Sequence, residues 1–306
     1  MVIVAGKGGV GKTTVTATMA RLAAAEGMDT LIVEVEGKSG LAALYGRPPL
    51  GYEESILLPR AGAEGEVRGR TLTPDDALLE YLDDHGMRRV SKRLVSTGAL
   101  DVVSTAAPGI KDILILGKVK QLEARGVADL ILLDAPAAGH AITFLLAARS
   151  LLDSVKVGPI NTQAQEVVEL LGDPKRSSVV LVTLPEETPV NELVETAFHL
   201  EDRVGVSLGP VVVNGLYPLL EGLDVDPTAA AEDAGTTLRA GEAEALSAAA
   251  AFRRKRTALQ DEQLARLAEK LPLAQLRLPF LFKSDLDPDD LSVLARAMRD
   301  GVEALT

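Results

Sequence analysis

Short apolar runs alternate with helix-like segments along most of the chain. The runs are rich in Val, Ile and Leu, and they cover residues 1–5, 30–36, 129–134, 178–184 and 210–214. Continuous apolar strands separated by helices are typical of a mostly parallel sheet with helices on both faces. The pattern therefore predicts an α/β fold. Residues 13–26 are expected to form the first helix, and residues 276–278 are a candidate for a last strand.

Two longer stretches interrupt this alternation. Residues 73–126 begin with Pro74-Asp75-Asp76, which opens a helix with acidic residues in its first turn, and residues 113–123 are typical of another helix. We therefore predict a mostly helical insertion at about 73–126. Residues 219–270 are again helical and rich in Ala, with acidic connections near the start of the stretch, around 221–237.

A glycine-rich loop follows the first apolar run. Residues Gly6 to Thr13 match the pattern G-x-x-x-x-G-K-[ST], in which glycines let backbone N–H groups turn toward phosphate oxygens. Lys12 is expected to reach the β- and γ-phosphates of ATP, and the Thr13 hydroxyl to bind Mg²⁺. We predict one P-loop NTPase domain over residues 1–306. The expected nucleotide-binding residues are Gly8, Gly9, Val10, Gly11, Lys12, Thr13 and Thr14.

A second lysine, Lys7, directly follows the first glycine of the loop. This deviant form of the loop resembles that of the dimeric ATPases that include the nitrogenase iron protein, MinD and ParA proteins, the arsenite-pump ATPase and the tail-anchored-protein-targeting ATPase. The resemblance implies that Lys7 is catalytic and reaches the nucleotide of a partner subunit. The alternative is a surface lysine with no such role.

The segment from Asp134 to His140 follows a strongly apolar run. It resembles the D-T-A-P-T-G-H switch of the arsenite-pump and tail-anchored-targeting ATPases, with alanines in place of the hydroxyl residues. A carboxylate at the carboxyl end of a strand lies where α/β sheets bind ligands. We therefore expect Asp134 to take part in catalysis and to hold Mg²⁺, directly or through water. His140 is a better candidate for a structural or switch-coupling residue than for a general base.

Three other segments resemble the same family. Residues 107–112 are similar to its P-G-I-D-E stretch, residues 182–186 to its V-T-x-P-E stretch, and residues 211–214 to its V-V-N strand end. The last resemblance implies that Asn214 reads adenine, whose N6 and N7 can pair with one amide; otherwise Asn214 only ends the strand. The resemblance extends in patches over about residues 1–290 and is closest to actinobacterial anion-transporting ATPase-like proteins, which occur as pairs of related subunits.

The first switch of the family departs from its pattern here. Where the family carries an S-T-D-P-A-H-like run, this chain has residues 34–39, and Glu36 aligns with the Asp that orients the attacking water. Glu is one methylene longer, and a displacement of ~1 Å can cost up to ~100-fold in rate. We expect Glu36 to be catalytic and to orient the water. The alternative is a solvated acid beside a weakly active site.

Composition narrows the function further. The net charge of −12 disfavours broad nucleic-acid binding, and the basic run 253–256 is expected to be a solvated helix face. The absence of cysteine excludes disulfides and thiolate metal sites and fits a cytoplasmic location. The N-terminus lacks the features of a signal peptide. The apolar stretch 130–148 contains Asp134 and Pro136, so no membrane span is predicted, although peripheral membrane association is compatible with the sequence.

The resemblance and the loop together imply an ATP- and Mg²⁺-dependent ATPase. It would act as a dimeric switch that couples its nucleotide state to a protein client that the sequence does not name. The partner subunit would be an identical chain or a related ATPase chain. The alternative is a regulatory subunit that binds nucleotide but hydrolyses little of it, and a DNA-positioning protein of the ParA kind is disfavoured by the acidic charge.

Overall fold

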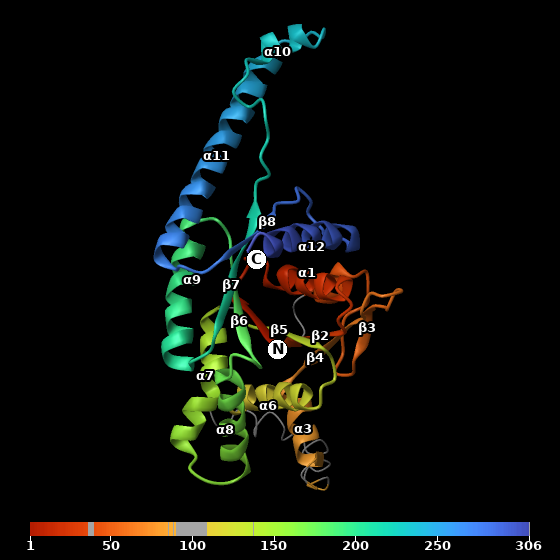
Figure 1. The fold of residues 1–306 in the computed structure, drawn as a ribbon, viewed down its shortest axis with the longest axis vertical. Helices are drawn as coiled ribbons and strands as arrows, with labels where there is room; N and C mark the ends of the chain where they lie inside the picture. The colour runs from red at the N-terminus through yellow and green to blue at the C-terminus, as the bar shows by residue number, and fades with distance from the viewer. Residues whose placement is uncertain (36–39, 85, 88, 90–108, 137, 306) are drawn as a thin grey trace.

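The computed structural model describes residues 1–35, 40–84, 86–87, 89, 109–136 and 138–305. Within these residues, eight strands form one sheet in the order β3-β4-β2-β5-β1-β6-β7-β8 (Figure 1). The strands are β1 (Val2–Gly6), β2 (Thr30–Val35), β3 (Ser55–Leu58), β4 (Val67–Leu72), β5 (Leu130–Asp134), β6 (Ser178–Thr183), β7 (Leu208–Leu216) and β8 (Gln275–Pro279). Only the pairing of the described edge strand β3 with β4 is antiparallel. The predicted α/β fold with a mostly parallel sheet is thereby confirmed.

Helices cover both faces of the sheet, as the apolar runs predict. One face packs against α1 (Lys12–Ala25), α2 (Leu41–Leu44) and α12 (Pro288–Glu303). The other face packs against α6 (Ile110–Ala124), α7 (Ala138–Ser154), α8 (Pro159–Gly172), α9 (Glu187–His199) and the C-terminal part of α11 (Glu242–Lys270). Alternate side chains of the strands enter one core or the other; Ile3 belongs to the second core and Val4 to the first, and both are fully buried.

Strands β3 and β4 were not predicted from the sequence. β4 reads Val-Arg-Gly-Arg-Thr-Leu, which lacks the apolar run of a strand covered on both faces. Its Arg70 is nevertheless buried, because the guanidinium lies over the Tyr52 ring, 4.6 Å from the ring centroid. An arginine that stacks on an aromatic ring can therefore be buried in a strand that its hydrophobicity alone does not predict.

The stretch around 73–126 contains α3 (Pro74–Asp84) and α6, which pack against each other. Residues 90–108 lie outside the described residues, and with them the first two residues of the segment 107–112 that was compared with the P-G-I-D-E stretch; the other four are Gly109 and the start of α6. A helix within the acidic stretch 221–237, α10 (Pro227–Asp233), was not expected there; Pro227 begins it, and the Asp226 side chain caps it by accepting from two backbone N–H groups.

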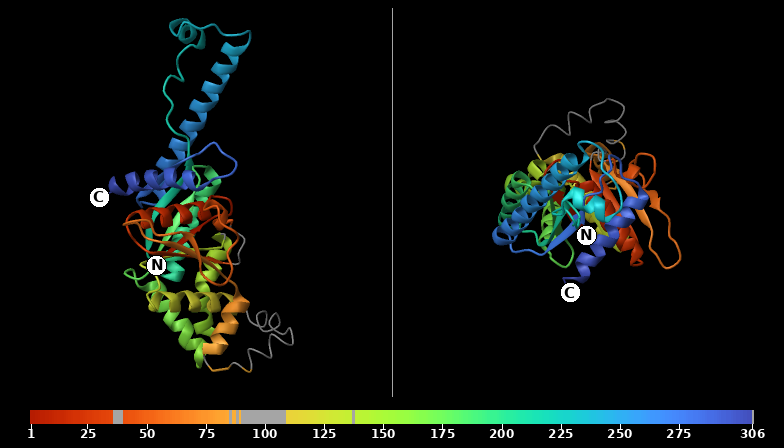
Figure 2. Two further views of the ribbon diagram at one scale, coloured as in Figure 1. Left: turned by 90° about the vertical axis from the view of Figure 1, so that its right-hand side faces the viewer. Right: turned by 90° about the horizontal axis from the view of Figure 1, so that it is seen from above.

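The segment from α10 to α11 extends well beyond the sheet (Figures 1 and 2). The basic run 253–256 lies on α11, and only part of it is a solvated face. Arg253 lies over the rings of Tyr217 and Phe282, and Arg256 pairs with Glu186, because α11 leans on loops that follow β6, β7 and β8. Across the described residues, no helix combines the length and apolarity that a membrane crossing requires.

Candidate nucleotide-binding site

The glycine-rich loop joins β1 to α1 near the middle of the sheet. A Cβ atom on Gly6 would lie 2.4 Å from the backbone oxygen of Val182 on β6, so the strand ends in a residue that only glycine can supply. Gly9 and Gly11 have φ angles of +84° and +89°, in the left-handed region. These two glycines curve the loop before α1 begins at Lys12, which gives the helix start a free set of N–H groups.

Asn214 contacts this loop from β7. Its Nδ2 donates a hydrogen bond to the carbonyl oxygen of Val10 at 3.0 Å. A Cβ atom on Gly11 would lie 2.2 Å from the same nitrogen, so the close approach of Asn214 also requires glycine at that position. The proposed role of Asn214 in reading adenine remains a prediction; the hydrogen bond adds a second role, that of bracing the loop.

The Lys12 side chain folds back over the loop that precedes it. Its Nζ donates to the carbonyl oxygen of Lys7 at 3.1 Å. Burial lowers the pKa of Lys12, and the nearby carboxylate of Asp134 opposes part of that shift. The ammonium group therefore lies inside the concave side of the loop, where an anion would gain the most from it.

Asp134 and the first turn of α1 form a cluster of oxygen atoms. Thr13 Oγ1 donates to Asp134 Oδ2 at 2.7 Å, and Thr16 Oγ1 lies 3.5 Å from Asp134 Oδ1. β5 carries Asp134 at its carboxyl end, in register with Val4 of β1, and this register sets the carboxylate beside the helix start. The sequence places these groups 121 positions apart, and the fold brings them together.

The Asp134 carboxyl group is almost fully buried, with 6% of the residue exposed. Burial raises its pKa to about 6, although the Thr13 hydrogen bond and the charge of Lys12 oppose the shift. The charge of Glu34 adds to the increase. Burial makes the ionised form of this carboxyl group costly, and a positive charge beside it would lower that cost.

Glu34 is a site residue that the sequence analysis did not select. It is 5% exposed, accepts a hydrogen bond from Thr71 Oγ1 at 2.7 Å, and is the register partner of Asp134 on the adjacent strand. A charged residue inside the apolar run Thr30–Val35 was a usable signal for it. Glu36, by contrast, lies outside the described residues, so its assignment as the water-orienting group stays a prediction.

Lys7 lies on the outer side of the loop and pairs with α9. Its Nζ is 2.7 Å from Glu192 Oε1, and both side chains are 41% exposed. An exposed pair of this kind contributes at most about 1 kcal/mol to stability. Lys7 therefore has an internal partner in the single chain that is weak enough to be exchanged.

Aromatic side chains gather just beyond Asn214. Tyr217, Phe280 and Phe282 have ring centroids 4.8–5.4 Å apart, and Phe280 N donates to the carbonyl oxygen of Leu216. Phe280 also approaches Gly215, the neighbour of Asn214. His140, at the start of α7, is exposed.

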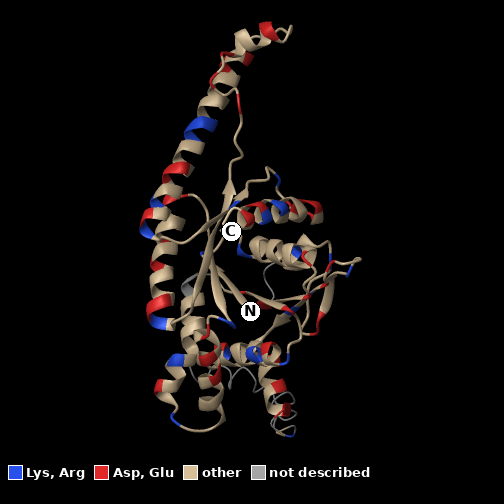
Figure 3. Ribbon diagram, viewed as in Figure 1, with Lys and Arg blue, Asp and Glu red and all other residues tan. Residues whose placement is uncertain are grey.

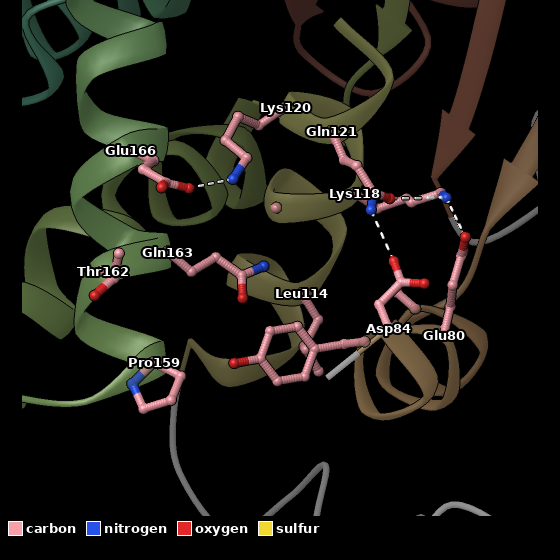
Figure 4. A pocket seen from close by; sticks show the side chains of 13 residues that line it. Glu80, Asp84, Leu114, Lys118, Lys120, Gln121, Pro159, Thr162, Gln163 and Glu166 are labelled. Carbon is pink, nitrogen blue, oxygen red and sulfur yellow. Dashed lines mark hydrogen bonds and ion pairs between the residues drawn. The ribbon is translucent and has the colours of Figure 1, made fainter. Parts of the chain in front are cut away.

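A separate cavity of about 310 Å³ lies between α3, α6 and α8 (Figure 4). Its charged side chains are already paired: Lys118 with Glu80, Lys120 with Glu166, and Asp84 with Gln121, whose Nε2 donates at 2.8 Å. The lining residues include none from the glycine-rich loop. Each charged side chain that lines this cavity therefore already has a partner within the protein.

Comparisons with known proteins identify relatives of this chain. The family described as "Anion-transporting ATPase" matches residues 1–163, which hold the loop and Asp134. "ATPase BagA" of Mycobacterium tuberculosis is 36% identical over 247 residues, covering 78% of this chain and 72% of the relative. "ATPase GET3B" of Arabidopsis thaliana is 23% identical over 263 residues, covering 70% and 63%. "Arsenical pump-driving ATPase" of Escherichia coli is 26% identical over 216 residues, covering 70% and 34%. The chain belongs to the anion-transporting ATPase family, whose members include the arsenical pump-driving ATPase and GET3 ATPases.

Proposed function

We propose that this protein binds Mg-ATP at the glycine-rich loop and hydrolyses it as a dimeric switch that acts on a protein client. The observation that carries the proposal is the contact between Thr13 and Asp134, 2.7 Å apart at the start of α1. It sets a hydroxyl and a buried carboxylate together directly beside a loop shaped to surround phosphate.

The donor set at this point fits Mg²⁺. The ion prefers hard oxygen ligands and is commonly held by one or two protein oxygens together with nucleotide phosphates. Thr13 and Asp134 supply such oxygens, and burial of the Asp134 carboxyl group, which raises its pKa to about 6, means that a cation beside it would stabilise its charged form. A bound Mg²⁺ would supply charge neutralisation for the phosphates. Thr13 would ligate it directly, and Asp134 would do so directly or through a water molecule.

Other residues of this chain would bind the nucleotide and orient the attacking water. Lys12 and the backbone N–H groups of residues 8–14 would bind the phosphates, because they line the concave side of the loop. Asn214 would read adenine, and its neighbour Phe280 offers a ring close to the same position. Glu36 would orient the attacking water.

Lys7 would act on the nucleotide of a partner subunit. Its side chain lies on the rim of the loop, pointing to α9 instead of into the phosphate cradle. A cation supplied across an interface would stabilise the charge of the transition state, as arginine fingers do. The partner would be a second copy or a related ATPase chain, and a cytoplasmic protein client would sense the change between open and closed dimers.

Isothermal titration calorimetry tests the binding step. Lys12→Ala should abolish measurable Mg-ATP binding and Thr13→Ala should weaken Mg-ATP more than ATP without the ion, whereas Lys255→Ala on α11 should bind as the native protein does. Unchanged ATP affinity in Lys12→Ala would refute the assignment of the loop.

A second candidate function is a regulatory subunit that keeps nucleotide but scarcely hydrolyses it. The observation in its favour is Glu at position 36, where the family pattern has the shorter Asp. Phosphate release at steady state, measured on the pure protein and again with related ATPase chains, distinguishes the two. Turnover only in the mixed sample would favour the regulatory subunit.

A further inference from the structure

The distal half of α11 has little of the chain to pack against. The helix contains 29 residues, of which Gln260, Gln263, Leu264 and Leu267 are its buried positions, all in the C-terminal half. The N-terminal half projects away from the sheet with α10 (Figures 1 and 2). Isolated helices gain most of their stability from packing of an apolar face, so a projecting helix of this kind is a candidate interaction surface.

One face of the projecting part forms an exposed stripe. Its members are separated by three and four residues in turn, so they share one side of the helix, and each is exposed. They are Ala245, Ala248, Phe252, Lys255 and Leu259. Phe252 is 66% exposed and Leu259 is 46% exposed. The alternation of 3 and 4 is the spacing by which helices pair along a seam.

The charges along the same helix are ordered. Glu242 and Glu244 lie in its first turn, and the basic run 253–256 lies about three turns later (Figure 3). Glu244 and Lys255 lie on the same flank of the stripe and are both exposed. A run of small residues, 247–251, separates the two charged groups and allows close approach of another helix.

We propose that α11 pairs antiparallel with α11 of a second copy of this chain, with the two-fold axis close to Ala250. In this register Phe252 of each helix lies opposite Ala248 of the other, so a large side chain meets a small one. Lys255 lies opposite Ala245, beside Glu244 of the partner helix, because the same flanks of two antiparallel helices face each other. The stripe is thus complementary to itself in both size and charge.

The charge of the neighbouring residues favours this occupant over a membrane. The connection from β7 to α11 carries Glu221, Asp224, Asp226, Glu232 and Asp233. These carboxylates would be repelled by anionic lipid headgroups, against which basic residues are needed. In a second copy, by contrast, the basic run 253–256 would lie close to the acidic start of this helix, and the two charges are complementary.

This interface is separate from the nucleotide-sandwich contact proposed for Lys7. It uses no residue of the loop and predicts a dimer that forms without nucleotide. Its failure would therefore leave the ATPase proposal standing, and the failure of Lys7 to act across subunits would leave this interface standing.

Sedimentation velocity of the full-length protein without nucleotide tests it over a range of concentrations. The native protein should be dimeric. Phe252→Glu should weaken the dimer by about tenfold or more, because a charge replaces the central apolar contact. Glu244→Lys and Lys255→Glu should each weaken it, and the double variant with both changes should restore most of the affinity, since the pair is re-formed with reversed signs.

Arg254→Glu is the matched control. It makes the same charge change as Lys255→Glu at the next residue, but Arg254 lies two residues from Phe252, nearly on the opposite side of the helix. It should leave the dimer unchanged. Circular dichroism and ATP titration on every variant verify folding.

Three results would overturn the proposal. The native protein could be monomeric without nucleotide, Phe252→Glu could stay fully dimeric, or the double charge swap could fail to restore the dimer. Binding of the native protein to phosphatidylcholine–phosphatidylglycerol vesicles, lost in Phe252→Glu, would assign the stripe to a membrane and would likewise refute the pairing.

Discussion

At the residue scale, Asp134 is the group whose surroundings constrain the site most. Its carboxyl group is buried beside Glu34 and is hydrogen-bonded by Thr13, with Lys12 near enough to lower the cost of its charge. The balance leaves its pKa at about 6, above the ordinary value of 3.8. The protein therefore keeps a poorly compensated anion at neutral pH, at the point where a divalent cation would gain most from it.

Replacing this carboxylate by its neutral isostere should stabilise the nucleotide-free protein. Between pH 3.8 and about 6 the folded state binds more protons than the unfolded chain, so the charge of Asp134 lowers stability as pH rises through that window. Asp134→Asn should raise the free energy of unfolding by about 1–3 kcal/mol above pH 7. The gain should disappear near pH 4. Urea denaturation at both pH values, without Mg²⁺, measures it, and an equal gain at pH 4 and 8 would contradict the assignment of the shift to Asp134.

Two glycines of the loop allow the cost of backbone strain to be measured apart from the cost of a side-chain clash. Gly9 and Gly11 both have positive φ, but an added Cβ has nothing within 4 Å at Gly9 and meets Asn214 Nδ2 at 2.2 Å at Gly11. Gly9→Ala should cost about 1–2 kcal/mol of stability. Gly11→Ala should cost more and weaken ATP binding. Asn214→Ala in the Gly11→Ala background should recover the excess cost. Equal effects of the two glycine substitutions on urea unfolding would mean that Asn214 does not press on the loop.

Sequence alone led to Lys12, Thr13 and Asp134 as candidates because a spacing pattern and a strand end select them without any knowledge of three-dimensional contacts. Glu34 escaped selection because its role depends on register: only the pairing of β2 with β5 puts it beside Asp134. The hydrogen bond from Asn214 to Val10 was equally hidden, since it joins residues 204 positions apart.

At the scale of elements, α9 bears on the proposed role of Lys7 through one ion pair. Glu192 of α9 holds Lys7 in the single chain, and Lys7 would have to leave it to reach a partner's nucleotide. The exchange costs little, because the pair is exposed.

Lys7 and Glu192 should respond differently to substitution. Lys7→Ala should keep its ATP affinity but lose turnover by about 10³-fold, on the scale of arginine-finger effects. Glu192→Gln should keep turnover or raise it, since it releases Lys7 without removing it. Phosphate release and ATP titration on both variants measure this. Full turnover of Lys7→Ala would rule out the trans mechanism.

Strands that are continuous apolar runs were predictable from the sequence, and β4, which mixes apolar and charged residues, was not. β1, β5 and β6 are continuous apolar runs covered on both faces, and their positions agree with the predicted runs to within a few residues. β4 contains two arginines and a glycine, and its burial depends on Tyr52, a partner outside the strand. The basic run on α11 was expected to be solvated because sequence does not reveal that Tyr217 and Phe282 lie beside Arg253.

At the scale of the whole molecule, the chain carries a net charge of −12 and no cysteine among its 306 residues. The charge keeps like molecules apart, so any dimer needs a specific contact to overcome that repulsion. The loop of Lys7 and the stripe on α11 are two candidates for such a contact, at different places on the chain. The family relation fixes the ATPase framework of the chain.

The absence of cysteine also limits which substrates can be inferred from the family relatives. A relative is named for driving an arsenical pump, at 26% identity over 216 residues. Trivalent arsenic and antimony are soft and bind thiolates, whereas this chain offers none, and its five methionines are a weaker substitute. Arsenite and antimonite should therefore neither bind nor stimulate. Because basal turnover could be slow, direct titration calorimetry with each oxyanion should accompany phosphate-release assays in the presence of ATP and Mg²⁺. A rise in turnover with arsenite, or heat of binding at micromolar concentration, would show that this protein senses arsenic by ligands other than thiolates.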